Sequence, residues 1–507
     1  AVGYAALSTD TRGQRSTAIG YGALADQNLT TASATHNTAV GYLAGGAITT
    51  AVRSTILGAL ASDAATTGER NVALGYAALS ADTKGNRSVS IGYEALGTQN
   101  FSTSTDNYNV GIGYLAGNVI STGVQNTLVG GLAGDVLTDA DDNTALGYGA
   151  LSSDTLGSKS TALGRSALAN QNFTTATDTF NTAVGYFAGV NVTTGKSLTF
   201  VGGNAGLSVN TGESNVAVGT NALYSATGDT ETVAVGVQAL ENQNKNGTAS
   251  NTAVGFRAGR DNTSGSSNTF IGAEAGLTIT NTTGQTAVGR GALAAQANSD
   301  NTAVGNYALN AATGASNTAV GQVAGFQITS GANNLALGKD ALRTGSPGGA
   351  ITTASNTIGL GDDNISSFNC QVALSVASDE RDKTDFTDLS LGLDFVKALE
   401  PVTYYWDKRS KYGDKTADDY DLEAQTPDGT HKEDWLDVGF KAQSVSALEE
   451  AAGYKIADKK NLTVSLSEDG KQYALRYEKF IPMLVKAIQE QDAIIQSLTA
   501  RITALES

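Results

Sequence analysis

The residues with the clearest chemical potential are a serine and a lysine five positions apart, Ser378 and Lys383, with Asp379 beside the serine. A serine hydroxyl becomes a nucleophile when a base takes its proton, and a lysine is such a base when burial or a nearby cation lowers its pKa. The two histidines, His36 and His431, lie elsewhere in the chain. These residues therefore favour Ser–Lys chemistry over a Ser–His–Asp triad.

The same serine also fits a structural role. Ser378 precedes Asp379 and Glu380, and a serine ahead of acidic residues is typical of a helix N-cap. Asp382 lies directly before Lys383, and a neighbouring carboxylate keeps a lysine protonated. On these few residues alone the N-cap is the better interpretation, so the surrounding sequence has to decide between the two.

The chain ahead of this serine is built from one short motif. It reads N-T-A-V-G-Y-x-A-(L or G), and it returns in about twenty copies over the first three-quarters of the chain. The copies come in groups of four, since the same spacings return from Gly3 to Gly75 and from Gly75 to Gly147. A fixed period this short predicts a solenoid or fibre whose units bury their apolar faces by stacking.

Each copy has the composition of a short strand. Thr182, Ala183 and Val184 run into Gly185, and small and β-branched residues followed by glycine predict a brief strand ended by a bend. A later alanine, such as Ala188, suits a crowded axis. The residue after it is Leu in the first two copies of a group and mostly Gly in the last two. Two arrangements explain this: a stack in which coils differ by phase, or one larger turn of four segments.

Strands this short need lateral partners and a shared core. Narrow coils bury little apolar surface, so we expect three chains to associate around one axis. With one coil per copy at about 4.8 Å, the shaft would be on the order of 100 Å long. The predicted fold is mainly β, with a trimeric repetitive β-solenoid or β-roll shaft over residues 1–343. A transition with a degenerate repeat follows over 344–377, and then a small α+β domain over 378–507.

The repeats over residues 1–342 resemble the head repeats of trimeric bacterial adhesins, and the repeats of phage tail fibres at least as well. One copy in most groups carries a longer insertion rich in Asn and Thr. The aromatic residues of these insertions are candidates for glycan binding, since aromatic faces and amides suit sugars: Phe101, Tyr108, Phe173 and Phe180. The favoured alternative is that Phe101 and Phe173 pack back on the shaft and the remaining loop is solvated.

The composition changes near residue 378, because about a tenth of the residues before it are charged and about a third after it. Five motifs follow in order: S-D-E-R-D-K from 378, L-G-L-D-F-V from 391, L-E-P-V-T-Y-Y-W from 399, V-G-F-K-A-Q from 438, and L-R-Y-E-K-F-I-P-M-L from 475. Together they resemble the intramolecular chaperone auto-processing domain that ends phage endosialidases, tailspikes and many tail fibres.

This resemblance implies a domain that trimerises, templates the β-fibre ahead of it and then cuts itself off. It places the scissile bond between Ala377 and Ser378 and makes Ser378 the nucleophile. Lys383 matches the family's lysine, although Asp382 stands where the family has leucine. Asp379 is the third candidate catalytic residue. The reaction would be one intramolecular cleavage by a Ser–Lys dyad, with no external substrate.

The end of the chain carries a heptad pattern. Its apolar positions, interrupted by one glutamine, are Leu484, Ile488, Gln491, Ile495, Leu498, Ile502 and Leu505. Spacings of four and three predict a coiled coil over residues 481–507, three-stranded in the resembling family. Near-identical repeats can slip by a whole unit, since each slipped register keeps most contacts. A coiled coil at one end would set the alignment of three chains.

The sequence predicts a structural homotrimeric fibre of a phage tail or a similar extracellular appendage. Its expected partners are its own copies, a host-surface glycan or protein, and a virion or appendage baseplate reached through a missing N-terminal region. The alternative is a bacterial surface adhesin or extracellular filament with the same C-terminal domain. A glycan-degrading tailspike would need an acidic pair in a large non-repetitive domain.

Composition argues against several other classes. A net charge of −17 does not suit a nucleic-acid-binding surface. One cysteine, Cys370, and two histidines predict no metal and no cofactor. No apolar run of about 20 residues is present, so we expect no membrane insertion.

Overall fold

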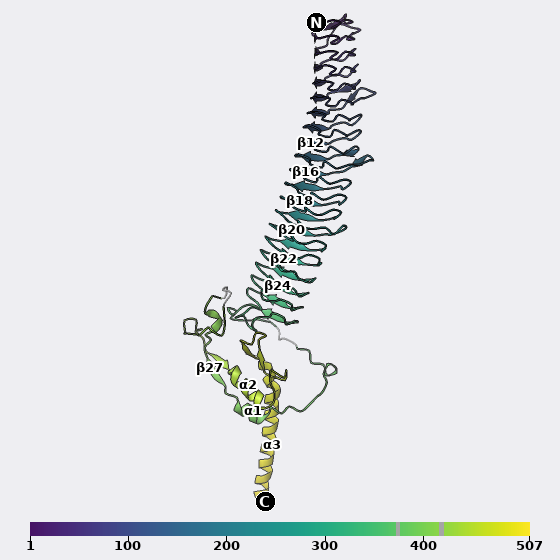
Figure 1. The fold of residues 1–507 in the computed structure, drawn as a ribbon. Coiled ribbons are helices and arrows are strands. Elements are labelled where there is room, and N and C mark those ends of the chain that lie inside the picture. Colours follow the sequence, from purple (N-terminus) through teal and green to yellow (C-terminus); the bar gives the residue numbers. More distant parts are fainter. Residues whose placement is uncertain (372–375, 415–419, 507) are drawn as a thin grey trace. The chain divides into compact units, whose positions relative to one another are not determined.

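The computed structural model describes residues 1–371, 376–414 and 420–506. The chain forms two compact units, Ala1–Asp300 and Asn301–Ser507. The first unit is a stack of coils, each of which contributes one short strand to a common ladder (Figure 1). The predicted β-solenoid is thus confirmed.

The main ladder of the first unit runs from coil to coil in parallel. Its strands are β2 (Thr17–Ile19), β4 (Thr38–Val40), β5 (Thr55–Leu57), β6 (Val72–Leu74), β8 (Val89–Ile91), β10 (Val110–Ile112), β11 (Thr127–Val129), β12 (Thr144–Leu146), β14 (Thr161–Leu163), β16 (Thr182–Val184), β17 (Thr199–Val201), β18 (Val216–Val218), β19 (Val233–Val235), β20 (Thr252–Val254), β21 (Thr269–Ile271) and β22 (Thr286–Val288). Thr pairs with Thr and Ala with Ala, as Thr161 and Ala162 do with Thr182 and Ala183. Each motif copy is therefore one coil, which selects the first of the two arrangements.

Short two-stranded parallel ladders form in and beside the insertions. They pair β1 (Gly13–Gln14) with β3 (Ser33–Ala34), β7 (Gly85–Asn86) with β9 (Thr105–Asp106), and β13 (Gly157–Ser158) with β15 (Thr177–Asp178). The insertions thus extend the stack sideways, in the same parallel sense as the main ladder.

The first residue of the motif forms a buried asparagine ladder. Asn109 accepts a hydrogen bond at Oδ1 from the backbone N–H of Asn126, at 2.9 Å, and donates from Nδ2 to the carbonyl of Gly123, at 2.7 Å. The equivalent asparagines in this unit are also buried: Asn37, Asn71, Asn126, Asn143, Asn181, Asn215, Asn251 and Asn268. An apolar residue here would leave buried backbone donors and carbonyls without partners, which explains the motif's asparagine.

The grouping of motif copies in fours follows from the volume of the side chains that fill the core. Most strands carry a buried Ala at their centre, but a large side chain replaces it at regular intervals: Ile56, Leu128, Phe200 and Phe270. A Cβ added to Gly189 would lie 2.9 Å from Phe200 and 3.0 Å from Leu168. Gly therefore replaces Leu where a neighbouring strand already fills the interior, and the packing density stays even along the stack.

The second unit begins with coils of the same kind. Their strands are β23 (Thr302–Val304), β24 (Thr318–Val320), β25 (Leu335–Leu337) and β26 (Ile358–Leu360), paired in parallel and in register. The degenerate repeat expected from the sequence supplies β26. The stack ends there, just before the segment that leads to Ser378.

The rest of the second unit is a small α+β domain. Its elements are η1 (Glu380–Asp382), α1 (Leu393–Ala398), β27 (Val402–Tyr404), η2 (Arg409–Lys411), β28 (Asp437–Gly439), α2 (Ala442–Ala451), β29 (Val464–Leu466), β30 (Tyr473–Leu475), η3 (Tyr477–Lys479) and α3 (Phe480–Glu506). The pairs β27–β28 and β29–β30 are antiparallel. Their strands are three residues long, so the domain depends on its helices for a core.

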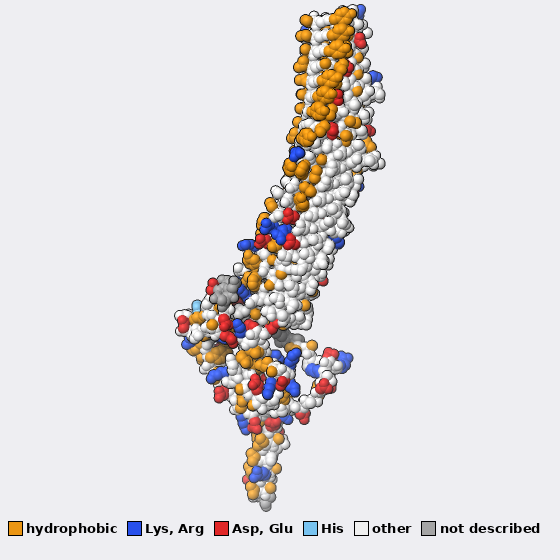
Figure 2. Space-filling view, viewed as in Figure 1, with side chains coloured by type: hydrophobic (Ala, Val, Ile, Leu, Met, Phe, Trp, Pro, Cys, Tyr) orange, Lys and Arg blue, Asp and Glu red, His pale blue; other side chains and the backbone are white. Residues whose placement is uncertain are grey.

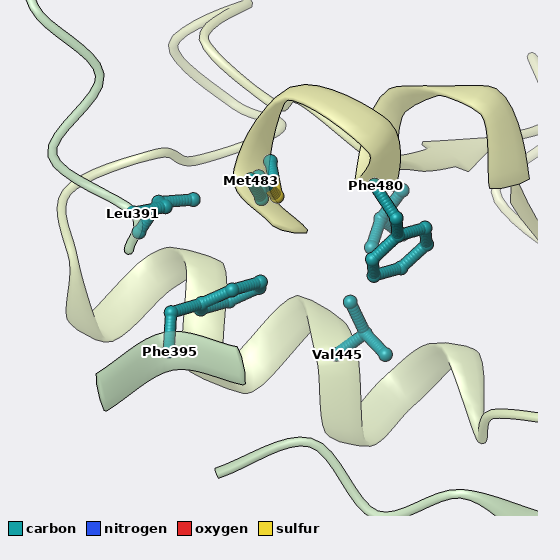
Figure 3. Packing of buried hydrophobic residues seen from close by; sticks show 6 residues of the cluster. Leu391, Phe395, Val445, Phe480 and Met483 are labelled. Atoms are coloured by element: carbon teal, nitrogen blue, oxygen red, sulfur yellow. The ribbon is translucent and has the colours of Figure 1, made fainter. Parts of the chain in front are cut away.

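That core joins the helices to the second hairpin. The buried side chains are Leu391, Phe395, Val445, Val464, Phe480 and Met483, and Figure 3 shows helix side chains converging between the elements. Two buried or half-buried carboxylates tie other segments of the domain to α3 and α2: the first residue of α1 and the residue before β29. Glu490 of α3 accepts the backbone N–H of Leu393 at 2.7 Å, and Glu449 of α2 accepts that of Thr463 at 2.6 Å. The N-terminal part of α3 is therefore integral to this domain.

The motif glycine allows close backbone approach between coils. Gly185 has φ +141°, and a Cβ there would lie 2.5 Å from the carbonyl oxygen of Gly202 in the next coil. We predict that Gly185→Ala lowers the free energy of unfolding by about 2 to 4 kcal/mol, because backbone strain adds to a clash with backbone. Chemical denaturation followed by circular dichroism measures this.

Gly203→Ala is the matched control, since a Cβ at Gly203 would meet no heavy atom of the described residues within 4 Å. We expect a change below about 1 kcal/mol for it. Equal unfolding curves for the two variants would contradict this account of the motif glycine.

Candidate functional site

The structure brings Ser378 and Lys383 together. One turn of 3-10 helix, η1, separates them, and Lys383 closes it by donating its backbone N–H to Glu380. The Lys383 Nζ lies 2.5 Å from Ser378 Oγ and 3.2 Å from the Ser378 carbonyl oxygen. As an ammonium, Lys383 donates to the serine; as a neutral amine at the same place, it would accept the serine proton. The pair thus has the geometry of a Ser–Lys dyad.

Asp379 shapes this turn. Its Oδ1 accepts the backbone N–H of Arg381 at 2.9 Å, and its Oδ2 accepts from the Arg381 guanidinium at 2.6 Å. Hydrogen bonds from the Arg381 side chain and backbone hold the pKa of Asp379 below its usual value. The N-cap of η1 is Asp379, so the interpretation of Ser378 as an N-cap is wrong. A catalytic role for Asp379 stays a prediction.

The dyad is open to solvent in the single chain. Ala377, Ser378 and Lys383 are all exposed. A lysine acts as a base most readily in a desolvated site or next to another cation. The Ser378 Oγ and Lys383 Nζ atoms are therefore close enough for proton transfer. Within one chain, however, the pair is not buried as this chemistry favours.

The insertion aromatics divide into two kinds. Phe101 and Phe173 are only 5% and 6% exposed, so their rings pack against the shaft, which was the favoured alternative to glycan binding. The prediction that Phe101 and Phe173 bind glycan is therefore wrong, because a buried ring offers no face to a surface ligand. Tyr108 and Phe180 are 49% and 59% exposed. A role for them in glycan binding stays a prediction.

Both exposed rings carry a cation. The Arg87 guanidinium lies 5.2 Å from the ring centroid of Tyr108, and the Lys159 ammonium lies 5.5 Å from that of Phe180. Distances of this order are typical of cation–π contacts. One face of each ring is therefore already in contact with a cationic side chain of the shaft.

A buried polar network that the sequence analysis missed holds each insertion. Asp82 accepts hydrogen bonds from the backbone N–H of Gly85 and from the Gln99 side chain, at 2.9 and 2.6 Å. Burial raises the pKa of Asp82 despite these bonds. Asp154 and Gln171 repeat the arrangement in the next group, with an oxygen–nitrogen distance of 2.5 Å. The signal was present in the sequence, since a Gln opens each insertion and an Asp precedes it by one coil.

The second missed feature is an exposed apolar face on the first unit. The residue after the motif glycine forms a tyrosine column, defined as Tyr4, Tyr21, Tyr42, Tyr76, Tyr93, Tyr114, Tyr148 and Tyr186, with 44% to 76% of each side chain exposed. The rings stack in two runs, Tyr4 to Tyr42 and Tyr76 to Tyr114, with a centroid distance of 5.3 Å between Tyr4 and Tyr21. Figure 2 shows hydrophobic side chains in rows that follow the direction of the stack, most clearly toward its N-terminal end. Other residues, such as Ala59 and Gly131, interrupt the column. Exposed apolar side chains grouped in this way are typical of an interaction surface.

Helix α3 presents a similar face. Beyond the domain core its predicted seam is solvent-exposed in the single chain, with 45% to 85% of each apolar seam side chain accessible: Leu484, Ile488, Ile495, Leu498, Ile502 and Leu505. Among the described residues, no helix combines the length and hydropathy needed to cross a bilayer.

Residues 378–454 match the family model described as chaperone of endosialidase. Neither the curated proteins nor the solved structures contain a match to the chain. The match begins at Ser378, the serine of the dyad, and the domain core continues beyond it to Phe480 and Met483. Ahead of it lie the parallel β-coils. Residues 378–454 are therefore similar to the chaperone of endosialidase, and they follow a β-solenoid shaft, which matches a tailspike with a C-terminal chaperone domain.

Proposed function

We propose that the chain is one subunit of a homotrimeric phage tail fibre or tailspike, and that its C-terminal domain aligns three shafts and then cuts itself off. The observation that carries this proposal is the exposed apolar seam of α3, which follows the residues that match the chaperone of endosialidase. Templating and self-cleavage are what the family description and the dyad geometry support together.

The seam argues for association through α3. The helix has 27 residues, or about 40 Å at 1.5 Å per residue. Only Phe480, Met483 and Ala487, near its N-terminal end, are buried. The predicted heptad positions lie on another side of the helix and are solvent-exposed in the single chain. Such a seam is buried when copies of the helix supercoil. Three copies are proposed by analogy with the resembling family.

The shaft supports the same assembly. The tyrosine column and the outward residue of the strands, such as Ile19 and Leu57, are exposed on the first unit. Apolar surface of this extent stabilises a complex when it is removed from water. A trimer would bury it, and the α3 seam would decide which coils of the three chains meet.

Self-cleavage follows from the dyad. Lys383, as a neutral amine, takes the Ser378 hydroxyl proton, and Oγ attacks the carbonyl carbon of Ala377. The Ala377–Ser378 C–N bond breaks as Lys383 returns the proton to the nitrogen, which leaves an ester on Oγ. Water then hydrolyses the ester to the Ala377 carboxylate and the free serine hydroxyl. Because both dyad residues are exposed in one chain, we expect a neighbouring subunit to desolvate them.

In this proposal the fibre attaches to a glycan or protein on a host surface, with exposed Tyr108 and Phe180 as candidate contacts. It joins a virion or appendage baseplate. Binding requires no metal or cofactor.

Cleavage is tested by the mass of the folded chain. We predict that the wild-type protein yields a fragment ending at Ala377 and another beginning at Ser378, because the dyad acts on that bond alone. Ser378→Ala and Lys383→Met should both stay at full length, whereas Lys397→Met, a lysine change on exposed α1 surface, should be cut as the wild type. Intact-mass spectrometry distinguishes these products.

Full-length wild type after native folding would contradict self-cleavage. Equal cutting of wild type and Ser378→Ala would instead show that another protease makes the fragment.

The trimer is tested at the seam, in the uncleaved Ser378→Ala chain. We predict that Ile495→Glu reduces the assembly to monomers, because three carboxylates would be buried together at several kcal/mol each. Ala500→Glu introduces the same charge on the opposite side of α3 and should leave the trimer intact. Sedimentation equilibrium gives both masses.

A trimer that survives Ile495→Glu, or one that both variants dissociate, would show that this seam is not the interface.

A further inference from the structure

Glu468 reaches from the C-terminal domain to the last coil of the shaft, within the second unit. It lies in the turn between β29 and β30. Its Oε2 accepts the backbone N–H groups of Thr352 and Ala354 at 2.9 and 3.2 Å, and its Oε1 accepts that of Thr353 at 2.9 Å. The hydroxyl groups of Thr352 and Thr353 also donate to Oε1. One carboxylate therefore satisfies five donors at the end of the coil stack.

The same donors have a different acceptor in the preceding coils. Thr329, one coil before Thr352, donates its backbone N–H to the carbonyl oxygen of Thr352 at 2.8 Å and its hydroxyl to the same oxygen at 3.0 Å. In the first unit, Thr66 likewise donates both groups to the carbonyl oxygen of Thr83, at 2.9 and 3.0 Å. Thr352 follows the same pattern at 2.9 and 3.0 Å, with Glu468 in place of the carbonyl of a further coil.

The carboxylate is suited to this position because it has only acceptors. Partial burial alone would raise the pKa of Glu468. The hydrogen bonds from the Thr353 side chain and from the backbone N–H groups of Thr352, Thr353 and Ala354 outweigh that effect and lower the pKa to about 2. The group is thus ionised throughout the pH range in which proteins usually fold.

Further contacts hold the domain against the same coil. A Cβ at Gly349 would lie 2.5 Å from the Cβ of Ser467, so the turn packs directly on the shaft backbone. Lys408 donates to the carbonyl oxygen of Asp363 at 3.2 Å, just after β26. These two contacts hold the domain, and with it the turn that carries Glu468, against the last coil.

We infer that Glu468 acts as a surrogate coil: it offers the last shaft coil the kind of acceptor that a neighbouring coil supplies at Thr66 and Thr329, and in this way starts the ladder. The inference rests on the proposed chaperone function and names the residue that performs it. A solenoid gains stability from contacts between neighbouring coils. Formation of its first coil is therefore unfavourable in free energy unless a partner is already present. The carboxylate provides that partner before a second coil exists.

Refolding kinetics test this inference in the full-length Ser378→Ala chain. A contact formed in the folding nucleus changes the folding rate, whereas one formed late changes the unfolding rate. We predict that Glu468→Ala slows formation of the protease-resistant shaft by about tenfold or more and leaves the unfolding rate within about twofold. Glu468→Gln, which keeps one oxygen acceptor, should give an intermediate folding rate.

Glu450→Ala is the matched control, since it removes an exposed carboxylate from α2 in the same domain, and it should fold as the parent does. A parental folding rate in Glu468→Ala would overturn the inference, as would a change confined to the unfolding rate. Deleting residues 378–507 separates the two hypotheses. If the deletion fails to fold while Glu468→Ala folds normally, only the role of Glu468 is wrong; if the deletion folds normally, the chaperone function is wrong as well.

Discussion

The structure depends on one hydrogen-bonding constraint: the backbone donors on one side of a coil are satisfied by acceptors of the next coil. The Thr329–Thr352 pair shows this in the shaft, and the Asn109–Asn126 pair shows it for buried side chains. Because interior donors without partners are costly, a coil is stable only beside another coil. A stack of this kind needs a defined end, and in the second unit the Glu468 carboxylate occupies the place of the missing acceptor.

The same constraint explains why a repetitive shaft would carry a folding domain. Every coil offers nearly the same donors and acceptors, so the ladder alone does not determine which coils of different chains should meet. Features outside the ladder have to do so. In the proposed assembly, the exposed seam of α3 would distinguish one alignment, and the end of the stack at β26 would give a fixed starting point. Cutting at Ser378 after assembly would remove the aligning domain and leave the shaft without an easy route back.

The sequence predicted local features well and long-range ones poorly. The Thr-Ala-Val strands and the motif glycine follow from short-range preferences, and the volume rule behind the Leu and Gly alternation was visible as a pattern before its cause was known. The first residue of the motif was quoted without a role, because its value lies in bonds to the next coil. The interpretation of Ser378 as an N-cap was wrong by one residue. The N-cap is Asp379, whose side chain accepts the backbone N–H of Arg381. Glu468 meets Thr352 across 116 residues of sequence, and no local pattern marks that contact.

Hydrogen exchange pulse-labelling during refolding of the uncleaved chain tests the central claim most directly. If the ladder starts at the Glu468 end, the amides of β26 and β25 gain protection first, and protection then spreads coil by coil toward residue 1. Protection that appears first near β2, or in all coils at once, would contradict a ladder started by the C-terminal domain.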